Sequence, residues 1–346
     1  WHLTSSSACT MLDQEQLLGD RIDRSGQGKK GNDMRLRKTG PLIILAIWVV
    51  ALSLTACSPA VTENTDSVRT TIRISALKGP TGMGLVKLMS DQDAKKTNND
   101  YQFNLTGSPD DIVAQISSGQ ADIAALPTNL AAVLYQKTNQ SIRMLAVNTL
   151  GVLYILEKGD QVHSLADLSG RELTASGQGA VPEYVLNDLL SHGNLAQPPK
   201  ITYKAEHEEL ATLAAAGKAD LVMLPEPFVT SVLNKNPDMR IALDLTSEWK
   251  KIHQDSSDSE LAMGCLVVTA SFAQNQPAAV GSFLTEYKAS TDYVNEQPAA
   301  AGALIAQYKI MADASLAAKA IPNCHIVFMQ GAAMKNVLQP FYEILF

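Results

Sequence analysis

The sequence predicts an α/β protein with two similar lobes, each built around a mostly parallel sheet. The stretch GQADIAALPTNL at Gly119–Leu130 returns as GKADLVMLPEPF at Gly217–Phe228. The residues around both stretches stay in register without a gap, so that Pro127 corresponds to Pro225. Strand-like and helix-like patterns alternate in both copies, which is typical of parallel sheets with right-handed crossovers. The chain therefore contains two copies of one β-α-β-α-β unit.

Each copy is expected to begin with a strand, a glycine-bearing turn and a helix. In the first copy, residues 72–76 alternate apolar and polar side chains, and the GPTG break at 79–82 leads into a helical pattern. The second copy repeats this order within 171–190, where the turn is GQG at 177–179. The two turns therefore occupy equivalent places in the two lobes.

The remainder of each copy is expected to contain a capped helix and a buried strand. Ser108 precedes Pro109 and is followed three residues on by Asp111, which is the pattern of a helix start. Gly119 and Gly217 mark the helix ends, where glycine is favoured. The runs DIAAL and DLVML that follow are apolar and bounded by breaks, as in strands that are covered on both faces.

The N-terminal part predicts export from the cytoplasm. Residues 34–56 place a basic stretch before an apolar run that is shorter than the ~20 residues a membrane span needs, which indicates a signal peptide. Residues 57–69 are polar and without periodicity, which predicts a flexible tether. Residues 1–33 fit neither signal nor domain and begin with Trp1, so we expect them to be an untranslated or non-native extension upstream of Met34.

Composition and motifs argue against several function classes. The 346 residues include 35 acidic and 28 basic ones, which argues against a nucleic-acid partner. GPTGMGLVK has the glycine spacing of a phosphate-binding loop, but Leu85 stands where that motif needs Lys. The six histidines are scattered, and His207 is expected on a solvated helix face, so no metal site is predicted. No G-x-S-x-G, H-E-x-x-H or C-x-x-C pattern occurs, and neither an enzyme nor a cofactor is expected.

Four turns are the candidate ligand-binding site. Parallel α/β sheets bind ligands outside the carboxyl ends of their strands. In each lobe these ends are the turn after the first strand and the Pro turn after DIAAL or DLVML, and helix N-termini with free N–H donors follow most of them. The alternative is that the turns are only structural. The candidate residues are Pro80, Thr81, Gly82, Met83, Thr128, Asn129, Gly177, Gln178, Gly179, Ala180 and Glu226.

Several phrases of the sequence resemble a known family. LKGPTGMGLVKLM, LPTNLAAVLY, LGVLYILEKGD and MLPEPFVT, together with the lipobox-like LTAC at 54–57, are similar to those of solute-binding lipoproteins of bacterial ABC importers. The similar branch serves nitrate, sulfonate, taurine and thiamine-precursor uptake. The resemblance covers Thr70–Phe346 and does not identify the solute.

The resemblance implies a type II periplasmic-binding-protein fold, in which two strands cross between the lobes. These strands would lie in Leu150–Asp160 and Leu261–Phe272. Lobe one would then comprise residues 70–157 and 262–346, and lobe two residues 158–261.

The resemblance also implies a function. The protein would be extracytoplasmic, lipid-anchored to the cell membrane at Cys57 and monomeric. It would deliver a small polar solute to an ABC permease and its ATPase by closing its cleft. Two alternatives stay open: a solute sensor for a membrane receptor, and an extracytoplasmic hydrolase.

The Pro turns suggest the chemistry of the solute. The first places neutral Thr128 and Asn129 after its proline, whereas the second places Glu226 there. None of the four turns contains Arg, and Lys78 is the only adjacent cation. A buried carboxylate favours an amine or an aminoheterocycle, such as a thiamine-type pyrimidine, over a sulfonate or nitrate. The alternative is that Glu226 caps the following helix and points away from the cleft.

Two cysteines of the predicted mature chain leave a further choice open. Cys265 and Cys324 both lie in apolar, strand-like runs of the C-terminal portion. An oxidising compartment permits a disulfide between them, whereas buried thiols are the alternative.

Overall fold

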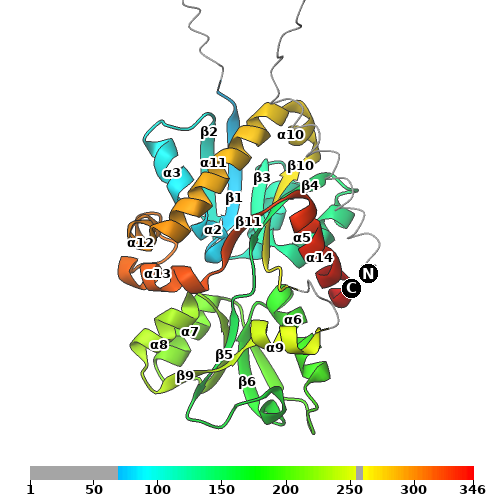
Figure 1. Ribbon diagram of the computed structural model, residues 1–346, viewed down its shortest axis with the longest axis vertical. Coiled ribbons are helices and arrows are strands. Elements are labelled where there is room, and N and C mark those ends of the chain that lie inside the picture. The colour runs from blue at the N-terminus through cyan, green and yellow to red at the C-terminus, as the bar shows by residue number, and fades with distance from the viewer. Residues whose placement is uncertain (1–68, 255–259) are drawn as a thin grey trace, which may run out of the picture.

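The computed structural model describes residues 69–254 and 260–346. Two sheets lie one above the other, and helices cover each of them (Figure 1). We call the six-stranded sheet with its helices lobe one, and the five-stranded sheet with its helices lobe two. The predicted signal peptide, nearly all of the predicted tether and the predicted lipidation site Cys57 lie outside the described residues.

The sheet of lobe one has the strand order β11-β4-β10-β3-β1-β2. β1 runs parallel to β2 and β3, whereas β10 runs antiparallel to β3 and β4, and β11 antiparallel to β4. The strand bounds are β1 (Thr71–Leu77), β2 (Asp100–Thr106), β3 (Ile123–Pro127), β4 (Ile142–Thr149), β10 (Gly264–Thr269) and β11 (Ile326–Met329).

The sheet of lobe two has the strand order β7-β6-β8-β5-β9, which repeats the arrangement of lobe one. β6 runs parallel to β7 and β8, whereas β5 runs antiparallel to β8 and β9. The strand bounds are β5 (Leu153–Lys158), β6 (Glu172–Ser176), β7 (Lys200–Lys204), β8 (Leu221–Pro225) and β9 (Met239–Asp244). The two lobes are therefore similar, as the repeated sequence predicts.

Each sheet is mixed rather than mostly parallel, and one strand of each explains the difference. β5 and β10 are the first strands that the chain forms after it crosses from the other lobe. The repeat strands point their carboxyl ends toward the other lobe, so a strand that enters from there runs in the opposite direction. β5 and β10 therefore pair antiparallel with the last strands of the repeats, β8 and β3.

The chain crosses between the lobes twice. It leaves β4 at Thr149 and enters β5 at Leu153, and it returns before β10 begins at Gly264. The lobe boundary expected at residue 157 lies within β5, which pairs with β8 and β9 of lobe two. The crossing at residues 150–152 lies inside the segment Leu150–Asp160 that the resemblance implies, and the strand that follows it belongs to the sheet of lobe two.

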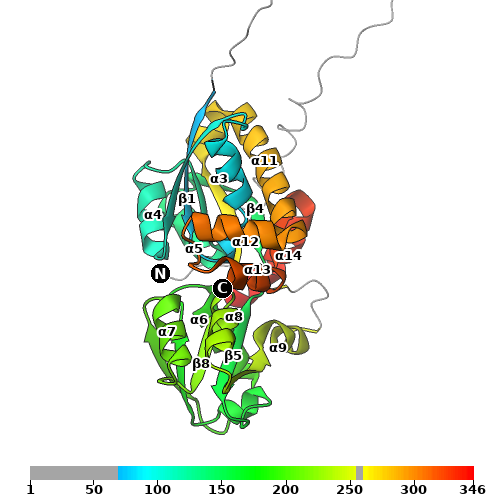
Figure 2. The same ribbon diagram turned by 90° about the vertical axis from the view of Figure 1, so that its left-hand side faces the viewer.

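Helices pack on both faces of each sheet (Figures 1 and 2). In β3, Ile123 and Ala125 belong to one hydrophobic cluster, while Ala124 and Leu126 belong to another. The apolar run DIAAL is therefore a strand covered on both faces, as predicted. The helices are α2 (Pro80–Met83), α3 (Val86–Asp93), α4 (Pro109–Ser117), α5 (Thr128–Lys137), α6 (Val181–His192), α7 (His207–Ala215), α8 (Phe228–Lys235), α9 (Leu245–Ile252), α10 (Ala270–Asn275), α11 (Pro277–Glu296), α12 (Pro298–Gln307), α13 (Ala314–Ala320) and α14 (Gly331–Leu345), with short 3-10 helices at Leu165–Leu168 and Ile321–Asn323.

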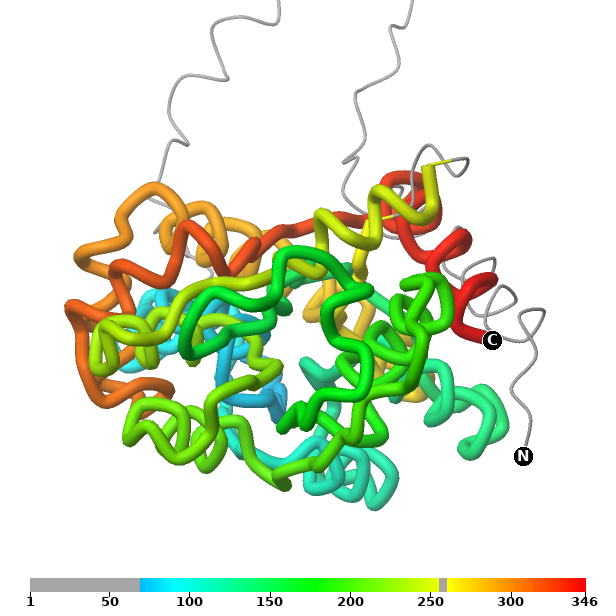
Figure 3. Tube along the Cα trace, turned by 90° about the horizontal axis from the view of Figure 1, so that it is seen from below, coloured from blue at the N-terminus to red at the C-terminus, as the bar shows by residue number. Residues whose placement is uncertain are grey.

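The C-terminal helix α14 connects the two lobes on one side. Trp249 of α9 contacts Phe341 of α14 with ring centroids 5.7 Å apart, and Tyr184 of α6 contacts Phe346 at 6.2 Å. Figure 3 shows α14 beside this side of lobe two. One hydrophobic cluster continues through these contacts from lobe one into lobe two. Within the described residues, no helix is both long enough and apolar enough to span a bilayer.

Cys265 and Cys324 are buried thiols in the structure rather than a disulfide. Cys265 lies in β10 and its thiol donates to the carbonyl oxygen of Leu126, with a sulfur–oxygen distance of 3.6 Å. Cys324 packs in a different hydrophobic cluster, between α12, α13 and the start of β11. The common apolar character of the two segments therefore reflects burial in separate parts of the core.

Candidate functional site

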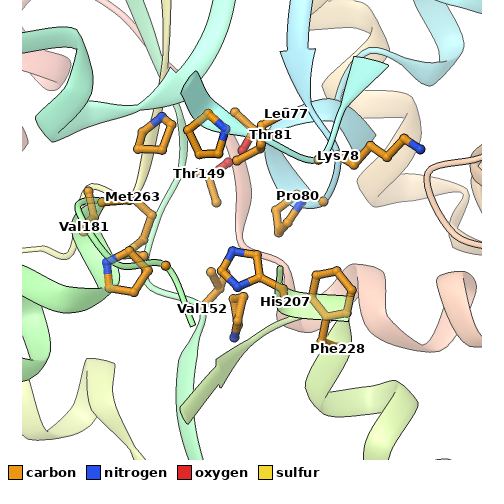
Figure 4. A pocket seen from close by; sticks show the side chains of 18 of the residues that line it. Leu77, Lys78, Pro80, Thr81, Thr149, Val152, Val181, His207, Phe228 and Met263 are labelled. Carbon is orange, nitrogen blue, oxygen red and sulfur yellow. The ribbon is translucent and has the colours of Figure 1, made fainter. Parts of the chain in front are cut away.

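A cavity of about 100 Å³ lies between the two lobes (Figure 4). It opens where the carboxyl ends of the repeat strands of both lobes face each other. Lobe one and the crossings contribute Leu77, Lys78, Gly79, Pro80, Thr81, Gly107, Pro109, Pro127, Thr149, Val152 and Met263. Lobe two contributes Gly177, Gln178, Ala180, Val181, Pro182, Ala205, Glu206, His207, Pro225, Glu226 and Phe228.

Six of the candidate residues line this cavity and five do not. Those that line it are Pro80, Thr81, Gly177, Gln178, Ala180 and Glu226. Met83 is instead fully buried in a hydrophobic cluster of lobe one. Gly82 lies against backbone, since a Cβ there would be 2.7 Å from the Leu77 carbonyl oxygen. Thr128 is fully buried, and its hydroxyl donates to the carbonyl oxygen of Ala262 at 2.5 Å.

The remaining two candidates contact each other across the lobes. The Asn129 side-chain amide donates from Nδ2 to the carbonyl oxygen of Gly179, at 3.0 Å. The Gly179 N–H in turn donates to Glu183 Oε2 at 2.6 Å. The first turn of α5 in lobe one is therefore joined to the glycine turn of lobe two, next to the cavity.

Glu226 borders the cavity and also caps a helix. Its carboxylate accepts hydrogen bonds from the Thr230 N–H at 3.0 Å and the Thr230 hydroxyl at 2.9 Å, which holds the start of α8. The residue is only 2% exposed, and this burial raises the pKa of Glu226 above the ordinary glutamate value. Hydrogen bonds from Thr230 and from Asn323 of lobe one oppose that rise in pKa. Glu226 thus caps α8, and it also lines the cavity.

His207 lines the cavity, so the expectation of a solvated helix face is wrong. Its Nδ1 lies 2.7 Å from the Ser176 hydroxyl oxygen, and its ring centroid lies 5.6 Å from that of Phe228. Burial lowers the pKa of His207 to about 4, because removing the ring from water disfavours the imidazolium form. The ring projects between Pro80 and Val152 in Figure 4.

The four predicted turns do not include the loop after the third parallel strand of each lobe, and in lobe two His207 follows that strand. β2 and β7 run parallel to β1 and β6, so their carboxyl ends reach the same edge of the sheet. The loops that follow them supply Gly107 and Pro109 in lobe one, and Ala205, Glu206 and His207 in lobe two. The same strand-end rule, applied to these strands, would have found the residues.

Two of the four ionisable side chains that line the cavity are carboxyl groups, those of Glu206 and Glu226. Glu206 reaches lobe one, since its Oε2 lies 3.0 Å from where a Cβ on Gly107 would be. Burial raises the pKa of Glu206, and the nearby carboxylate of Asp111 raises it further. Lys78 is exposed, and Figure 4 shows its side chain extending away from the other lining residues. No Arg is among the residues that line the cavity.

Comparisons with known proteins agree with this architecture. The NMT1/THI5-like family profile matches residues 100–301, and no curated protein matches. An ABC transporter structure from Parabacteroides distasonis is 23% identical with a TM-score of 0.65, over 80% of this chain and 92% of its own. The periplasmic aliphatic sulphonate binding protein SsuA from Escherichia coli is 16% identical with a TM-score of 0.63, over 80% and 91%. The Candida albicans CA3427 product, which has the generic periplasmic binding protein fold, is 14% identical with a TM-score of 0.51, over 75% and 81%.

Proposed function

The chain belongs to the NMT1/THI5-like family and has the periplasmic-binding-protein fold, and from this premise we propose that it is a solute-binding lipoprotein. It binds a small polar molecule outside the cytoplasm and delivers it to an ABC import permease and its ATPase. Lipid attachment at Cys57 holds it at the cell membrane, and it acts as a monomer. The observation that carries the proposal is the cavity enclosed by equivalent strand ends of two lobes.

The position of the cavity supports a closing-cleft mechanism. Its walls come from both lobes, while the described part of the chain crosses between them at residues 150–152 and again before Gly264. A rotation about these short crossings exposes the walls to solvent, and the reverse rotation buries a solute between them. The Asn129–Gly179 hydrogen bond forms only when the lobes are together, so it stabilises the closed form.

The lining of the cavity favours an amine or an aminoheterocycle over a sulfonate or nitrate. Glu206 and Glu226 are the carboxyl groups of the wall, and burial raises the pKa of each. An anionic solute beside a buried carboxylate costs free energy, whereas an amine or ring N–H donates to it. The wall also lacks Arg, which binds sulfonates and carboxylates through two parallel hydrogen bonds.

The hydrogen bond between Ser176 and His207 bears on the hydrolase alternative. Ser176 lies 2.7 Å from His207, which is the arrangement of an activated nucleophile. The Ser176 side chain is fully buried behind the ring, however, and Ser176 is not among the residues that line the cavity. A nucleophile must reach the solute, so this pair argues against the hydrolase alternative.

A thermal-shift screen tests the proposed solute class. We expect amines and aminopyrimidines to raise the melting temperature with concentration, because only the folded state binds them, and nitrate and alkanesulfonates to leave it unchanged. Glu226→Gln should weaken the affinity for amines about ten-fold, since it removes a charged acceptor. Glu172→Gln on β6 is the matched control, with a side chain that is 79% exposed. Stabilisation by a sulfonate or nitrate alone, with Glu226→Gln binding like the parent, would overturn the assignment.

A further inference from the structure

The two ring nitrogens of His207 have different surroundings. Nδ1 is 2.7 Å from the Ser176 hydroxyl oxygen, whereas Nε2 has no hydrogen-bond partner in the described part of the chain. Ser176 is the last residue of β6 and its side chain is fully buried. The hydrogen bond therefore connects a buried hydroxyl to a ring that borders the cavity.

The Ser176 hydroxyl determines which ring nitrogen carries the proton. Within residues 69–254 and 260–346, His207 Nδ1 is the one hydrogen-bond partner of that hydroxyl. Buried hydroxyl groups donate their hydrogen, because an unpaired buried donor costs free energy. The Ser176 O–H thus donates to Nδ1, and the neutral ring carries its hydrogen on Nε2. With the hydrogen on Nδ1 instead, the ring would donate to the Ser176 oxygen, and the hydroxyl hydrogen would have no acceptor within the described residues.

Packing holds the ring in this orientation. Phe228 lies against it with ring planes at 44°. Gly177, with φ +85°, passes so close that a Cβ there would be 3.3 Å from His207 Cε1 and 2.7 Å from Pro182 Cγ. Only glycine combines this backbone conformation with such a close approach. The ring is therefore fixed by Ser176, Gly177 and Phe228, and Nε2 is its one unpaired polar atom.

We infer that His207 is a specificity-determining residue, which presents Nε2–H to the cavity as a fixed hydrogen-bond donor. The solute then places an acceptor there, such as a ring nitrogen or a carbonyl oxygen. The carboxyl groups of Glu206 and Glu226 accept hydrogen bonds in the same wall. A cleft with a fixed donor and carboxylate acceptors selects an aminoheterocycle over a simple alkylamine. This inference rests on the proposed function and narrows its solute class.

The imidazole spectrum of the ¹⁵N-histidine-labelled protein tests the donor assignment without any solute. His207→Gln identifies the resonances of His207 among those of the six histidines. We expect a hydrogen on Nε2 and none on Nδ1 at pH 7, and a ring still neutral at pH 5.5. Ser176→Ala should populate the Nδ1–H tautomer, because the donor to Nδ1 is gone. A predominant Nδ1–H form in the parent, or a Ser176→Ala spectrum identical to it, overturns the inference.

A matched pair of rings tests the selectivity. 2-Aminopyrimidine and aniline both carry one amino group and are uncharged at pH 7.5, but only the first has ring nitrogens that accept hydrogen bonds. We expect the parent to bind 2-aminopyrimidine about ten-fold more tightly, and His207→Leu to bind both rings equally. His163→Leu, at a side chain that is 62% exposed, is the control and should keep the preference.

The outcomes separate this inference from the proposed function. Equal affinities of the parent for the two rings, with both bound, overturn the specificity role of His207. A parent protein that binds neither ring overturns the selection of aminoheterocycles, while the thermal-shift screen decides the wider solute class and the imidazole spectrum decides the donor assignment.

Discussion

Burial shifts the pKa values of two side chains in the cavity wall in opposite directions. It lowers the pKa of His207 to about 4 and raises that of Glu226, so both shifts favour the uncharged form. A solute that donates a hydrogen bond to Glu226 favours its carboxylate form and so opposes the effect of burial on this pKa.

The pKa of His207 predicts a loss of stability in acid. An unfolded histidine has a pKa of about 6.5, so between pH 6.5 and pH 4 the unfolded state binds a proton that folded His207 excludes. Stability should fall as pH falls through this window. The raised pKa of Glu226 acts in the opposite direction, because the folded state then binds a proton more readily than the unfolded state.

Comparing the parent with His207→Gln isolates the histidine contribution. Urea unfolding of both proteins at pH 7, pH 5.5 and pH 4.5 gives the difference in free energy of unfolding at each pH. We expect this difference to shift in favour of His207→Gln as the pH falls. A difference that stays constant from pH 7 to pH 4.5 contradicts the burial of a neutral His207.

The sequence predicts which residues are candidates for the site, but not which side chains surround each of them in the fold. The comparison of the two Pro turns predicts Glu226 as a site residue, and the structure places it in the cavity wall. Glu226 also accepts a hydrogen bond from the Thr230 N–H in the first turn of α8, and the backbone conformation that allows this bond cannot be predicted from the sequence. His207 looked like an ordinary helical residue because its burial depends on Ser176 and Phe228, which are distant from it in sequence.

At the scale of elements, the repeated phrase predicted most of the architecture. The in-register copies correctly gave equivalent strands and turns in both lobes, and an apolar strand covered on both faces. The direction of β5 and β10 was not predictable from their composition, because apolar strands look alike in either direction. The set of strand ends that meet at the cavity also includes those of β2 and β7, which pair parallel with β1 and β6.

The bond between α5 and the glycine turn of lobe two predicts a closure mutant. Asn129 Oδ1 accepts no hydrogen bond within the described residues, so Asn129→Ala removes the Gly179 contact and no other side-chain bond. We expect it to favour the open form and to weaken solute affinity roughly two- to ten-fold. Titration calorimetry with a stabilising amine measures this change.

The control for this prediction is Asn104→Ala. Asn104 is exposed on β2, and within the described residues its side chain bonds only to Gln115 of the same lobe, so Asn104→Ala should leave solute affinity unchanged. If Asn129→Ala binds the amine as tightly as Asn104→Ala does, the Asn129–Gly179 bond has no part in closure.

At the scale of the whole molecule, lipid attachment predicts where the protein resides. Cys57 follows a signal-like run and lies outside the described residues, so this prediction rests on the sequence alone. Cys57→Ala should leave an unlipidated precursor or a mislocalised protein, whereas the parent incorporates labelled fatty acid. Equal lipid labelling of Cys57→Ala would contradict the proposed anchor.

The central claim is that two lobes close over a solute, and small-angle X-ray scattering tests it most directly. The protein is measured alone and then saturated with the amine or aminoheterocycle that raises its melting temperature most. Closure predicts a smaller radius of gyration with solute, and a smaller change for Asn129→Ala at the same solute concentration. An unchanged radius of gyration on addition of a solute that calorimetry shows to be bound would contradict the closing-cleft account.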